Sequence, residues 1–187
     1  MNDKNIKKYS KFLSLVLRHK PEKIGIVLDK AGWVKVSELL TALKKYGTNM
    51  KLSDLEFVVK NNDKKRFAFS EDGKMIRANQ GHSVKVDLGY KECKPPEQLF
   101  HGTSIKHGVG KAITKDGLKK MNRHHVHLSD DWITAVNVGS RKGVPSVFTI
   151  DSESMYNDGL KFYLSDNGVW LTDHVPPKYF IWPVKKS

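Results

Sequence analysis

The stretch Arg123-His124-His125-Val126-His127-Leu128-Ser129 holds three of the eight histidines of the chain within four positions. Side chains alternate between two faces along a β-strand. As a strand, this stretch would therefore place His125, His127 and Ser129 on one face and the two apolar residues between them in a core. The pattern predicts the wall of a site, and these residues alone leave open a metal site, an acid–base site or a nucleotide site.

The residues around this stretch predict a small domain of short strands and few helices. Acidic residues open a predicted helix at 130–138, where they face the positive end of the helix dipole. A strand at 99–103 runs into a tight turn, and a helix is predicted at 104–115, although two glycines weaken it. Two more strands are predicted at 146–150 and 168–172. Such a mixture is typical of an α+β domain.

The first half of the chain has a different pattern, which predicts mainly helices. Apolar residues recur at helical spacing between residues 4 and 19, and Pro21 ends that helix, which places Arg18 and His19 in its last turn. Two shorter helices follow, each opened by a serine cap, and then a β-hairpin, at 38–46, 53–60 and 66–78. Three helices followed by a hairpin predict a winged-helix lobe, a fold often used on nucleic acid.

The predicted organisation is therefore two lobes joined by a linker. The linker is assigned to residues 89–97, where a proline pair at Pro95 and Pro96 interrupts both helix and strand. The winged-helix lobe occupies residues 1–88, and the α+β lobe occupies residues 98–187.

Charge is the strongest signal in the composition. The net charge is +13, and residues 1–94 hold 21 Lys and Arg against 11 Asp and Glu, whereas residues 95–187 hold 12 against 9. This imbalance predicts a polyanionic partner that is bound mainly by the first half. A surface that is simply solvated by lysine is the alternative.

The composition also limits the compartment. The chain shows no apolar run of membrane-spanning length and no apolar signal segment behind its N-terminus. Its single cysteine, Cys93, excludes an internal disulfide and suits a reducing cytosol. We expect a cytoplasmic protein that is monomeric and does not associate with membranes.

Several chemistries fit these residues poorly. His101, His125 and His127 could supply three nitrogen ligands to zinc, but no carboxylate lies near them in sequence to support the ligands. From residue 98 onward Glu153 is the only glutamate, so paired-carboxylate catalysis has little to use. Cys93 lies in the predicted linker, and there is no nucleophile elbow. Arginine and histidine remain, and both suit an anionic phosphate.

Seven blocks of sequence closely resemble the family of NAD-dependent RNA 2'-phosphotransferases. They follow the order of that family from about residue 9 to residue 180: Leu17-Arg18-His19, Asn62-Asp63-Lys64-Lys65-Arg66-Phe67, Ile76-Arg77-Ala78-Asn79-Gln80-Gly81-His82-Ser83, His101-Gly102-Thr103, His125-Val126-His127-Leu128-Ser129, Gly139-Ser140-Arg141 and Asn167-Gly168-Val169-Trp170-Leu171-Thr172.

The resemblance implies a winged-helix N-terminal lobe and a C-terminal lobe similar to ADP-ribosyltransferases, built on small mixed or antiparallel sheets. It implies removal of an internal 2'-phosphate from RNA, such as a tRNA splice junction, with NAD as co-substrate and no metal. The 2'-phosphate displaces nicotinamide to give an ADP-ribosylated RNA. The new ribose 2''-hydroxyl then attacks the phosphate, which yields RNA with a 2'-hydroxyl and ADP-ribose 1'',2''-cyclic phosphate.

The resemblance also implies which residues act. The catalytic set of the family corresponds to Arg18, His19, Arg66 and Arg141, and His19 would either transfer a proton or orient the phosphate. The residues implied to bind NAD are His101, Gly102, Thr103, His127, Ser129 and Val169. His125, Arg77 and His82 stay unassigned.

Two alternatives belong to other functional classes. One is an ADP-ribosyltransferase that modifies a terminal phosphate of a nucleic acid or a protein. The scarcity of glutamate disfavours a protein acceptor and leaves a terminal phosphate open. The other is a winged-helix regulator without enzymatic activity, against which the four catalytic-type residues argue.

Overall fold

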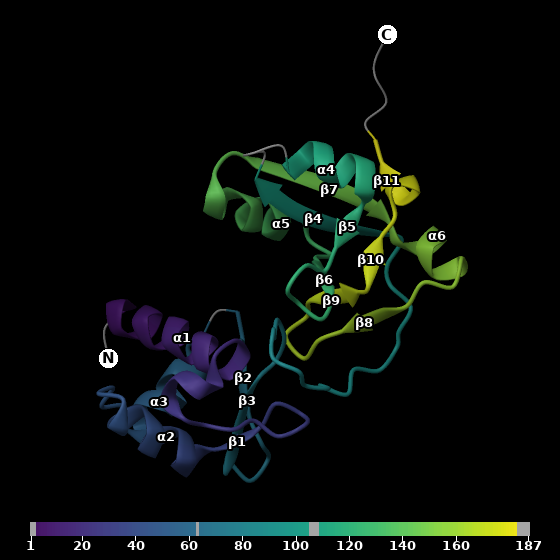
Figure 1. Cartoon of the computed structure of the whole chain (residues 1–187). Helices are drawn as coiled ribbons and strands as arrows, with labels where there is room; N and C mark the ends of the chain where they lie inside the picture. The colour runs from purple at the N-terminus through teal and green to yellow at the C-terminus, as the bar shows by residue number, and fades with distance from the viewer. Residues whose placement is uncertain (1–2, 63, 105–108, 183–187) are drawn as a thin grey trace. The chain divides into compact units, whose positions relative to one another are not determined.

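The computed structural model describes residues 3–62, 64–104 and 109–182, and they form a mixed α+β structure. Six α-helices and several small antiparallel sheets lie in these residues (Figure 1). Contacts divide the chain into two compact units, residues 1–89 and residues 90–187. Each unit has its own hydrophobic core.

The first unit is a three-helix cluster with a small sheet. Its helices are α1 (Asp3–Arg18), α2 (Val36–Lys45) and α3 (Leu52–Lys60). Its sheet has the order β1–β3–β2, from strands β1 (Val34–Lys35), β2 (Phe67–Phe69) and β3 (Met75–Ala78), all antiparallel. Two helices and a hairpin therefore follow α1, in the order that the sequence predicted.

The two serine caps that the sequence predicted are wrong. Helix α2 begins at Val36 and α3 at Leu52, so Ser37 and Ser53 lie in the first turns instead of capping them. The N-cap of α3 is Lys51, whose backbone N–H donates to the Asp54 carboxylate at 3.0 Å. The acidic side chain therefore satisfies the free N–H at this helix end.

Helix α1 carries Arg18 at its C-terminal end, directly after its last buried residues. Leu13, Val16 and Leu17 are fully buried in the core of the first unit, at the spacing of one helix face. The helix ends at Arg18, and the N–H groups of His19 and Lys20 both donate to the Leu15 carbonyl. The last buried turn thus carries Arg18 directly into the edge of the core.

The second unit contains three small sheets. The largest has the order β11–β7–β4, from β4 (Gln98–Ser104), β7 (Pro145–Asp151) and β11 (Phe180–Ile181). The next has the order β6–β9–β8, from β6 (Val126–Leu128), β8 (Phe162–Leu164) and β9 (Trp170–Thr172). Strands β5 (Leu118–Lys119) and β10 (His174–Val175) pair with each other.

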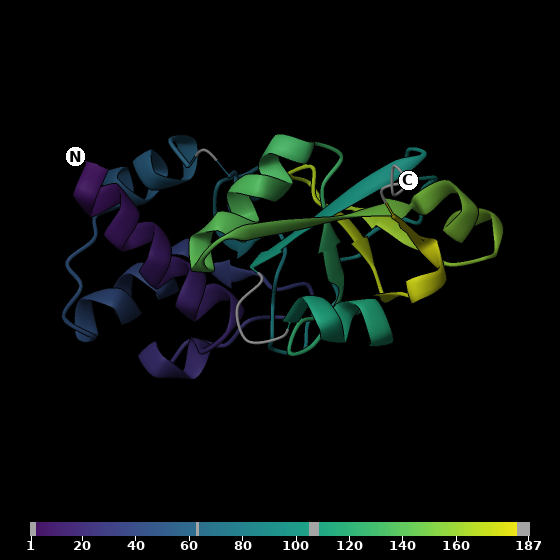
Figure 2. The same cartoon turned by 90° about the horizontal axis from the view of Figure 1, so that it is seen from above.

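Helices flank the long β4–β7 pair. Figures 1 and 2 show α4 (Val109–Asp116) and α5 (Trp132–Gly139) on opposite sides of this pair, and α6 (Ser152–Asn157) follows β7 directly. The 3₁₀ turn η3 (Ser140–Lys142) continues α5. Helix α5 packs closely on both strands because its Ala135 and Gly139 are small and buried.

Several predicted elements differ in extent, two of them markedly. Ser104 is the last residue of β4 and not the start of a helix, residues 105–108 lie outside the described part, and the helix runs from Val109. The histidine strand is only three residues long, because residues 121–125 form a turn and a bend before it. Val126 and Leu128 are 3% exposed, so the predicted apolar face is confirmed.

The segment after Gly89 pairs with the second unit. Glu92 forms an isolated bridge with Tyr163, and the Cys93 N–H donates to the Phe162 carbonyl at 3.0 Å. Pro95 is buried. None of the described helices is long and apolar enough to cross a membrane.

Candidate active site

In the first unit, Arg18 is held at the end of α1 by its surroundings. The Arg18 side chain is 9% exposed, and one Nη donates to the Arg66 carbonyl at 3.3 Å. Its guanidinium carbon lies 6.0 Å from the centre of the Phe67 ring, within reach of a cation–π interaction. The backbone carbonyl and the ring give the guanidinium a fixed position, while its charge is retained at every working pH.

Arg66 is anchored to the same unit through a buried polar pair. Asn62 donates from Nδ2 to Ser10 Oγ at 2.8 Å, and both residues are buried. An Arg66 Nη lies 3.3 Å from Asn62 Oδ1 and 3.5 Å from Ser10 Oγ. Ser10 lies on α1 and Asn62 follows α3, so the pair ties Arg66 to two helices.

The backbone before Arg66 is strained. Lys65 has φ of +40°, in a region that side-chain-bearing residues rarely adopt. Asn79 supports this turn twice: its side-chain Nδ2 donates to the Lys65 carbonyl at 2.7 Å, and its N–H donates to the Arg66 carbonyl at 2.9 Å. Strain of this kind is often stored at functional sites.

His19 is joined to the segment after β3. Its Nδ1 lies 3.0 Å from the Ser83 hydroxyl. The N–H groups of Ser83 and Val84 both donate to the Arg18 carbonyl, at 2.9 and 3.3 Å. The backbone that follows Gly81 therefore closes over the end of α1 and brings a hydroxyl to the exposed imidazole.

In the second unit, three residues form a connected group. His101 on β4 places its Nδ1 3.0 Å from the His127 carbonyl on β6. An Arg123 Nη lies 3.0 Å from His127 Nδ1. The bridge between Phe100 and Ser129 brings β4 and β6 together at this point.

The proton on His101 can be assigned from its partner. A carbonyl only accepts, so Nδ1 of His101 donates to the His127 carbonyl. Burial and the positive charge of Arg123 lower the pKa of His101, although the hydrogen bond to the carbonyl acts in the opposite sense. At neutral pH the ring is therefore neutral, and its Nε2 is a hydrogen-bond acceptor.

Gly102 has a structural reason to be glycine. A Cβ at this position would lie 1.7 Å from the Ala135 carbonyl oxygen of α5. Helix α5 therefore packs directly on the backbone of β4 between His101 and Thr103. The family resemblance implied Gly102 as an NAD-binding residue, and the close approach of α5 is a separate reason for a glycine at this position.

Arg141 lies on η3, directly after α5, and its side chain is exposed. Gly139 precedes this turn, and a Cβ there would lie 2.6 Å from the Thr103 carbonyl oxygen. The Ser104 hydroxyl also donates to the Lys142 carbonyl at 3.4 Å. Because η3 packs closely against the end of β4, the backbone position from which the Arg141 side chain extends is fixed.

The chain is similar to known proteins over most of its length. Residues 4–174 match the model of the family described as RNA 2'-phosphotransferase, Tpt1 / KptA family. The chain belongs to this family. It is 58% identical over 182 residues to a probable RNA 2'-phosphotransferase from Flavobacterium johnsoniae, covering 96% of this chain and 97% of that relative. It is 55% identical to the one from Trichormus variabilis, covering 92% and 93%.

Two further residues implied by the family resemblance, Ser129 and Val169, lie at one end of the β6–β9–β8 sheet. Leu128 pairs with Trp170, so Ser129 and Val169, one step beyond, lie at one end of these antiparallel strands. The Ser129 hydroxyl accepts from the Asp131 N–H at 3.1 Å, and the Val169 N–H donates to Ser165 Oγ at 3.0 Å. Val169 lies before β9 and is half-buried.

The three unassigned residues have clear local surroundings. The His125 ring lies 6.2 and 5.5 Å from the rings of Tyr90 and Tyr163, and burial lowers its pKa. Arg77 lies over Trp33, with 4.6 Å between the guanidinium carbon and the ring centre. His82 is 1% exposed and contacts the region of Gly32. These contacts describe packing within each unit.

Metal ligands do not gather in the described part of the chain. No group of three or more His, Cys, Asp and Glu side chains there is arranged to hold a metal ion. In particular, His127 Nδ1 faces Arg123 and His101 Nδ1 faces a carbonyl, so neither nitrogen points at a shared centre.

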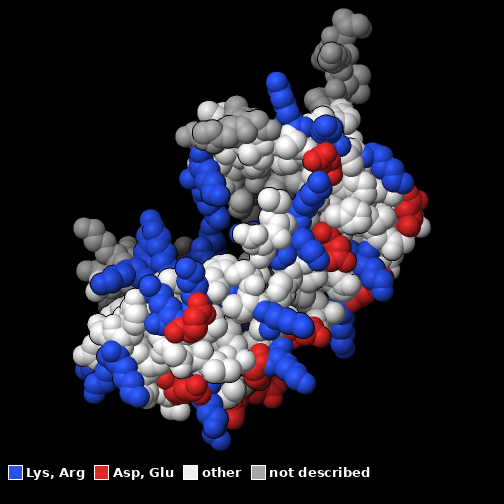
Figure 3. Space-filling model, in the orientation of Figure 1, with Lys and Arg blue, Asp and Glu red and all other residues white. Residues whose placement is uncertain are grey.

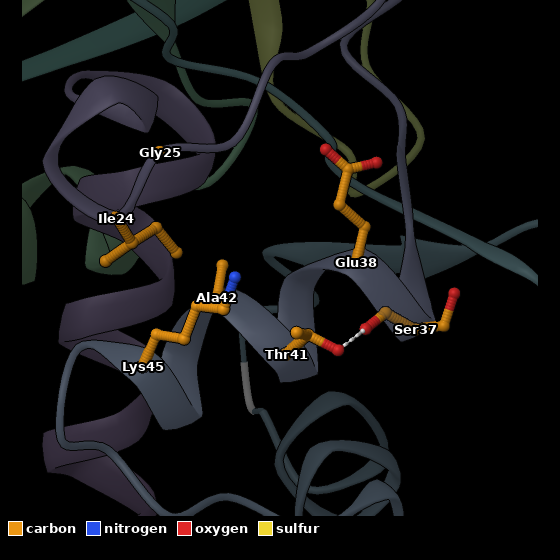
Figure 4. A pocket seen from close by; sticks show the side chains of 7 residues that line it. All are labelled: Ile24, Gly25, Ser37, Glu38, Thr41, Ala42 and Lys45. Carbon is orange, nitrogen blue, oxygen red and sulfur yellow. Dashed lines mark hydrogen bonds between the residues drawn. The ribbon is translucent and has the colours of Figure 1, made fainter.

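A separate depression of about 460 Å³ lies in the first unit between α2 and the 3₁₀ turn η1 (Pro21–Ile24). Figure 4 shows its lining residues, among which the Thr41 hydroxyl donates to the Ser37 carbonyl at 2.8 Å. None of the residues that the family resemblance implies lines this depression.

Sequence reasoning missed the residues that support the site. Asn62, Asn79 and Ser83 lie inside the quoted family blocks, but nothing in their spacing indicates a role. Ser10 lies in α1, where it reads as an ordinary helix residue, and Arg123 was noted only as the start of the histidine stretch. The contacts of Asn62 and Ser83 join segments 52 and 64 residues apart, and those of Asn79 reach 14 residues back to Lys65, distances that local patterns do not encode.

Proposed function

We propose that this chain removes the 2'-phosphate from RNA and transfers it to NAD, as an RNA 2'-phosphotransferase. The match to the family model over residues 4–174 and the relatives of the same description support this activity. The substrate would be RNA with an internal 2'-phosphate, such as a tRNA splice junction. The products would be RNA with a 2'-hydroxyl, nicotinamide and ADP-ribose 1'',2''-cyclic phosphate.

We assign the two units different parts of this task. The first unit, with three helices and a hairpin, would act as a winged-helix lobe that binds RNA, which suits its positive charge. The second unit would act as the NAD-binding lobe, similar to ADP-ribosyltransferases. The short antiparallel sheets and the histidines on β4 and β6 support this assignment.

Arg18, His19, Arg66 and Arg141 would act on the phosphate. The phosphate that begins the reaction is already an anion, so no general base is needed to create the nucleophile. Negative charge then moves around phosphorus, and guanidinium groups that are held in place stabilise it without reorganising. The anchored positions of Arg18 and Arg66 suit this role.

His19 would move a proton or orient the phosphate. The Ser83 hydroxyl lies 3.0 Å from its Nδ1 and would help to orient the exposed ring toward the substrate. Attack by a ribose hydroxyl in the second step requires loss of a proton, and an imidazole can accept one near neutral pH.

The donors and acceptors of the second unit fit a dinucleotide. His101 offers an acceptor at Nε2, suited to a ribose hydroxyl, and Thr103 offers a hydroxyl. His127 and Ser129 add polar groups from the neighbouring strand, while Gly102 and Val169 would contribute backbone and apolar surface. When bound, NAD supplies the ribose carbon to which the phosphate is transferred.

The single observation that carries the proposal is that hydrogen bonds hold Arg18, His19 and Arg66 within the first unit of a chain that matches the family: Arg18 bonds to the Arg66 carbonyl, and His19 bonds to Ser83. Its test is an assay with NAD and a short RNA carrying one labelled internal 2'-phosphate. We expect the label to appear in ADP-ribose cyclic phosphate. Arg18→Ala and Arg141→Ala should each slow turnover by roughly 10²–10³, the usual cost of one such donor.

Lys111→Ala is the matched control, because Lys111 is an exposed residue of α4 outside the proposed site. It should retain wild-type turnover. A stable ADP-ribosylated acceptor in place of the cyclic phosphate would indicate an ADP-ribosyltransferase instead. Release of no product that depends on NAD would overturn both assignments.

A further inference from the structure

Arg123 controls where the proton of His127 can lie. One Arg123 Nη is 3.0 Å from His127 Nδ1, and a guanidinium has donors but no acceptor. Nδ1 must therefore accept, because a protonated Nδ1 would place two N–H groups against each other. The ring is then neutral, and its proton is on Nε2. His127 becomes a hydrogen-bond donor on the side of the ring away from Arg123.

The turn before β6 places Arg123 for this contact. Met121 has φ of +54°, and the Arg123 N–H donates to the Lys120 carbonyl at 3.0 Å. A left-handed residue other than glycine is uncommon, and it marks a turn that the surrounding structure holds in place. The turn reverses the chain so that residue 123 lies beside residue 127.

Arg123 and Arg141 also share one electrostatic environment. Partial burial and the nearby charge of Arg141 lower the pKa of Arg123, although its side chain reaches solvent. No ion pair joins either arginine to an Asp or Glu among the residues that the structure describes. Two neighbouring cations without an acidic partner repel each other, and an anion between them would remove that repulsion.

We propose that Arg123, with Arg141 and the Nε2–H of His127, forms a phosphate-binding subsite in the second unit. This inference rests on the proposed function and extends it to a residue outside the implied catalytic and NAD-binding sets. Arg123 has two roles in it: its charge attracts the phosphate, and its hydrogen bond positions the His127 proton toward the ligand. The phosphate has two sources, the diphosphate of the dinucleotide or the 2'-phosphate of the RNA.

Binding measurements on the full chain test the subsite without requiring turnover. ADP-ribose carries a diphosphate and no 2'-phosphate, and adenosine carries neither. If the subsite holds the diphosphate, Arg123→Met should weaken ADP-ribose binding about 10- to 100-fold, as expected for a charge-assisted hydrogen bond, and leave adenosine binding unchanged. Titration calorimetry gives both affinities.

A second pair of probes tests the other source, the 2'-phosphate of the RNA. If the subsite holds the transferred phosphate, Arg123→Met should instead reduce the preference for a 2'-phosphorylated RNA over the same RNA with a 2'-hydroxyl, by a similar factor. ADP-ribose binding would then stay within about twofold of wild type. Unchanged affinity in both comparisons would overturn the subsite.

The second role has its own measurement. Long-range ¹H–¹⁵N spectra report which imidazole nitrogen carries the proton. In wild type, we expect His127 to be neutral with Nε2 protonated, and in Arg123→Met this fixed assignment should be lost. Arg123→Lys keeps a cationic donor and should restore it in part. The same tautomer in wild type and Arg123→Met would contradict the positioning role.

Lys119→Met is the matched control for removing a positive charge from the second unit. Lys119 is exposed, and among the described residues its ammonium group forms an ion pair with only the exposed Asp116, at 3.3 Å. It should leave all affinities and the His127 spectrum as in wild type. Because these readouts need no catalysis, an inactive chain that still shows the Arg123 dependence would refute the proposed function and keep this inference.

Discussion

At the scale of single residues, each proposed catalytic side chain of the first unit is held in place by specific contacts. Arg18 contacts a carbonyl and an aromatic ring, Arg66 contacts a buried Ser10–Asn62 pair, and His19 contacts the Ser83 hydroxyl. Catalysis by positioning requires such support, because a loosely held guanidinium must reorganise as charge develops.

Ser83 offers a direct test of this support. Ser83→Ala removes the hydroxyl that lies 3.0 Å from His19 Nδ1. One hydrogen bond of this kind contributes about 0.5–1.5 kcal/mol, so the single-turnover rate with saturating NAD and RNA should fall roughly 2- to 10-fold. Ser83→Thr keeps the hydroxyl and should recover most of the rate. Equal rates for Ser83→Ala and wild type would exclude a positioning role for Ser83.

At the scale of elements, the packing of α5 on β4 organises the second unit. Helix α5 lies directly on the backbone of Gly102, and the turn that follows it carries Arg141. Ala135 and Gly139 are small residues, which lets the helix approach the strand. The position of Arg141 therefore depends on the same contact that requires glycine at residue 102.

Gly102→Ala should disturb this contact. The new Cβ would overlap the Ala135 carbonyl, which lies 1.7 Å from its ideal position. Since α5 must shift, we expect a loss of about 1–3 kcal/mol in the free energy of unfolding, typical of an overpacked site. Denaturant unfolding of the full chain measures it.

Gly110→Ala is the control for this substitution. Gly110 lies in helix α4, and a Cβ placed there would have no neighbouring atom within 4 Å. Alanine there should leave stability equal or raise it by about 0.5–1 kcal/mol, because alanine favours the helix. If both variants were equally stable, the close approach of α5 would not explain Gly102.

At the scale of the whole molecule, charge is distributed unevenly along the chain. Residues 1–89 hold 19 Lys and Arg against 10 Asp and Glu, and residues 90–187 hold 14 against 10. On the face shown in Figure 3, Lys and Arg predominate over Asp and Glu. A basic surface of this kind binds nucleic acid mainly through its phosphates.

This charge predicts a strong salt dependence of RNA binding. Each phosphate that is neutralised on a single strand contributes about −0.7 to the slope of log K against log salt. With about four such contacts, raising salt from 50 to 200 mM should weaken RNA binding roughly 50-fold. ADP-ribose, with fewer charges, should weaken far less. Similar slopes for both ligands would show that the basic surface does not bind the RNA backbone.

The sequence by itself determined the family, the α+β class and the order of helices and hairpin in the first unit. Those features follow from residue types and from periodicity over short stretches, which a sequence records directly. It also placed Arg18 at the end of α1, because the buried face of that helix and Pro21 together leave no other end.

Only the tertiary structure decided how the site residues are held and protonated. His19 meets Ser83 across 64 residues, and Ser10 meets Asn62 across 52. The His127 proton is assigned by an arginine in the preceding turn, and Gly102 is explained by a helix that begins thirty residues later at Trp132. Such contacts depend on how the chain returns to itself, and local spacing contains no record of that return.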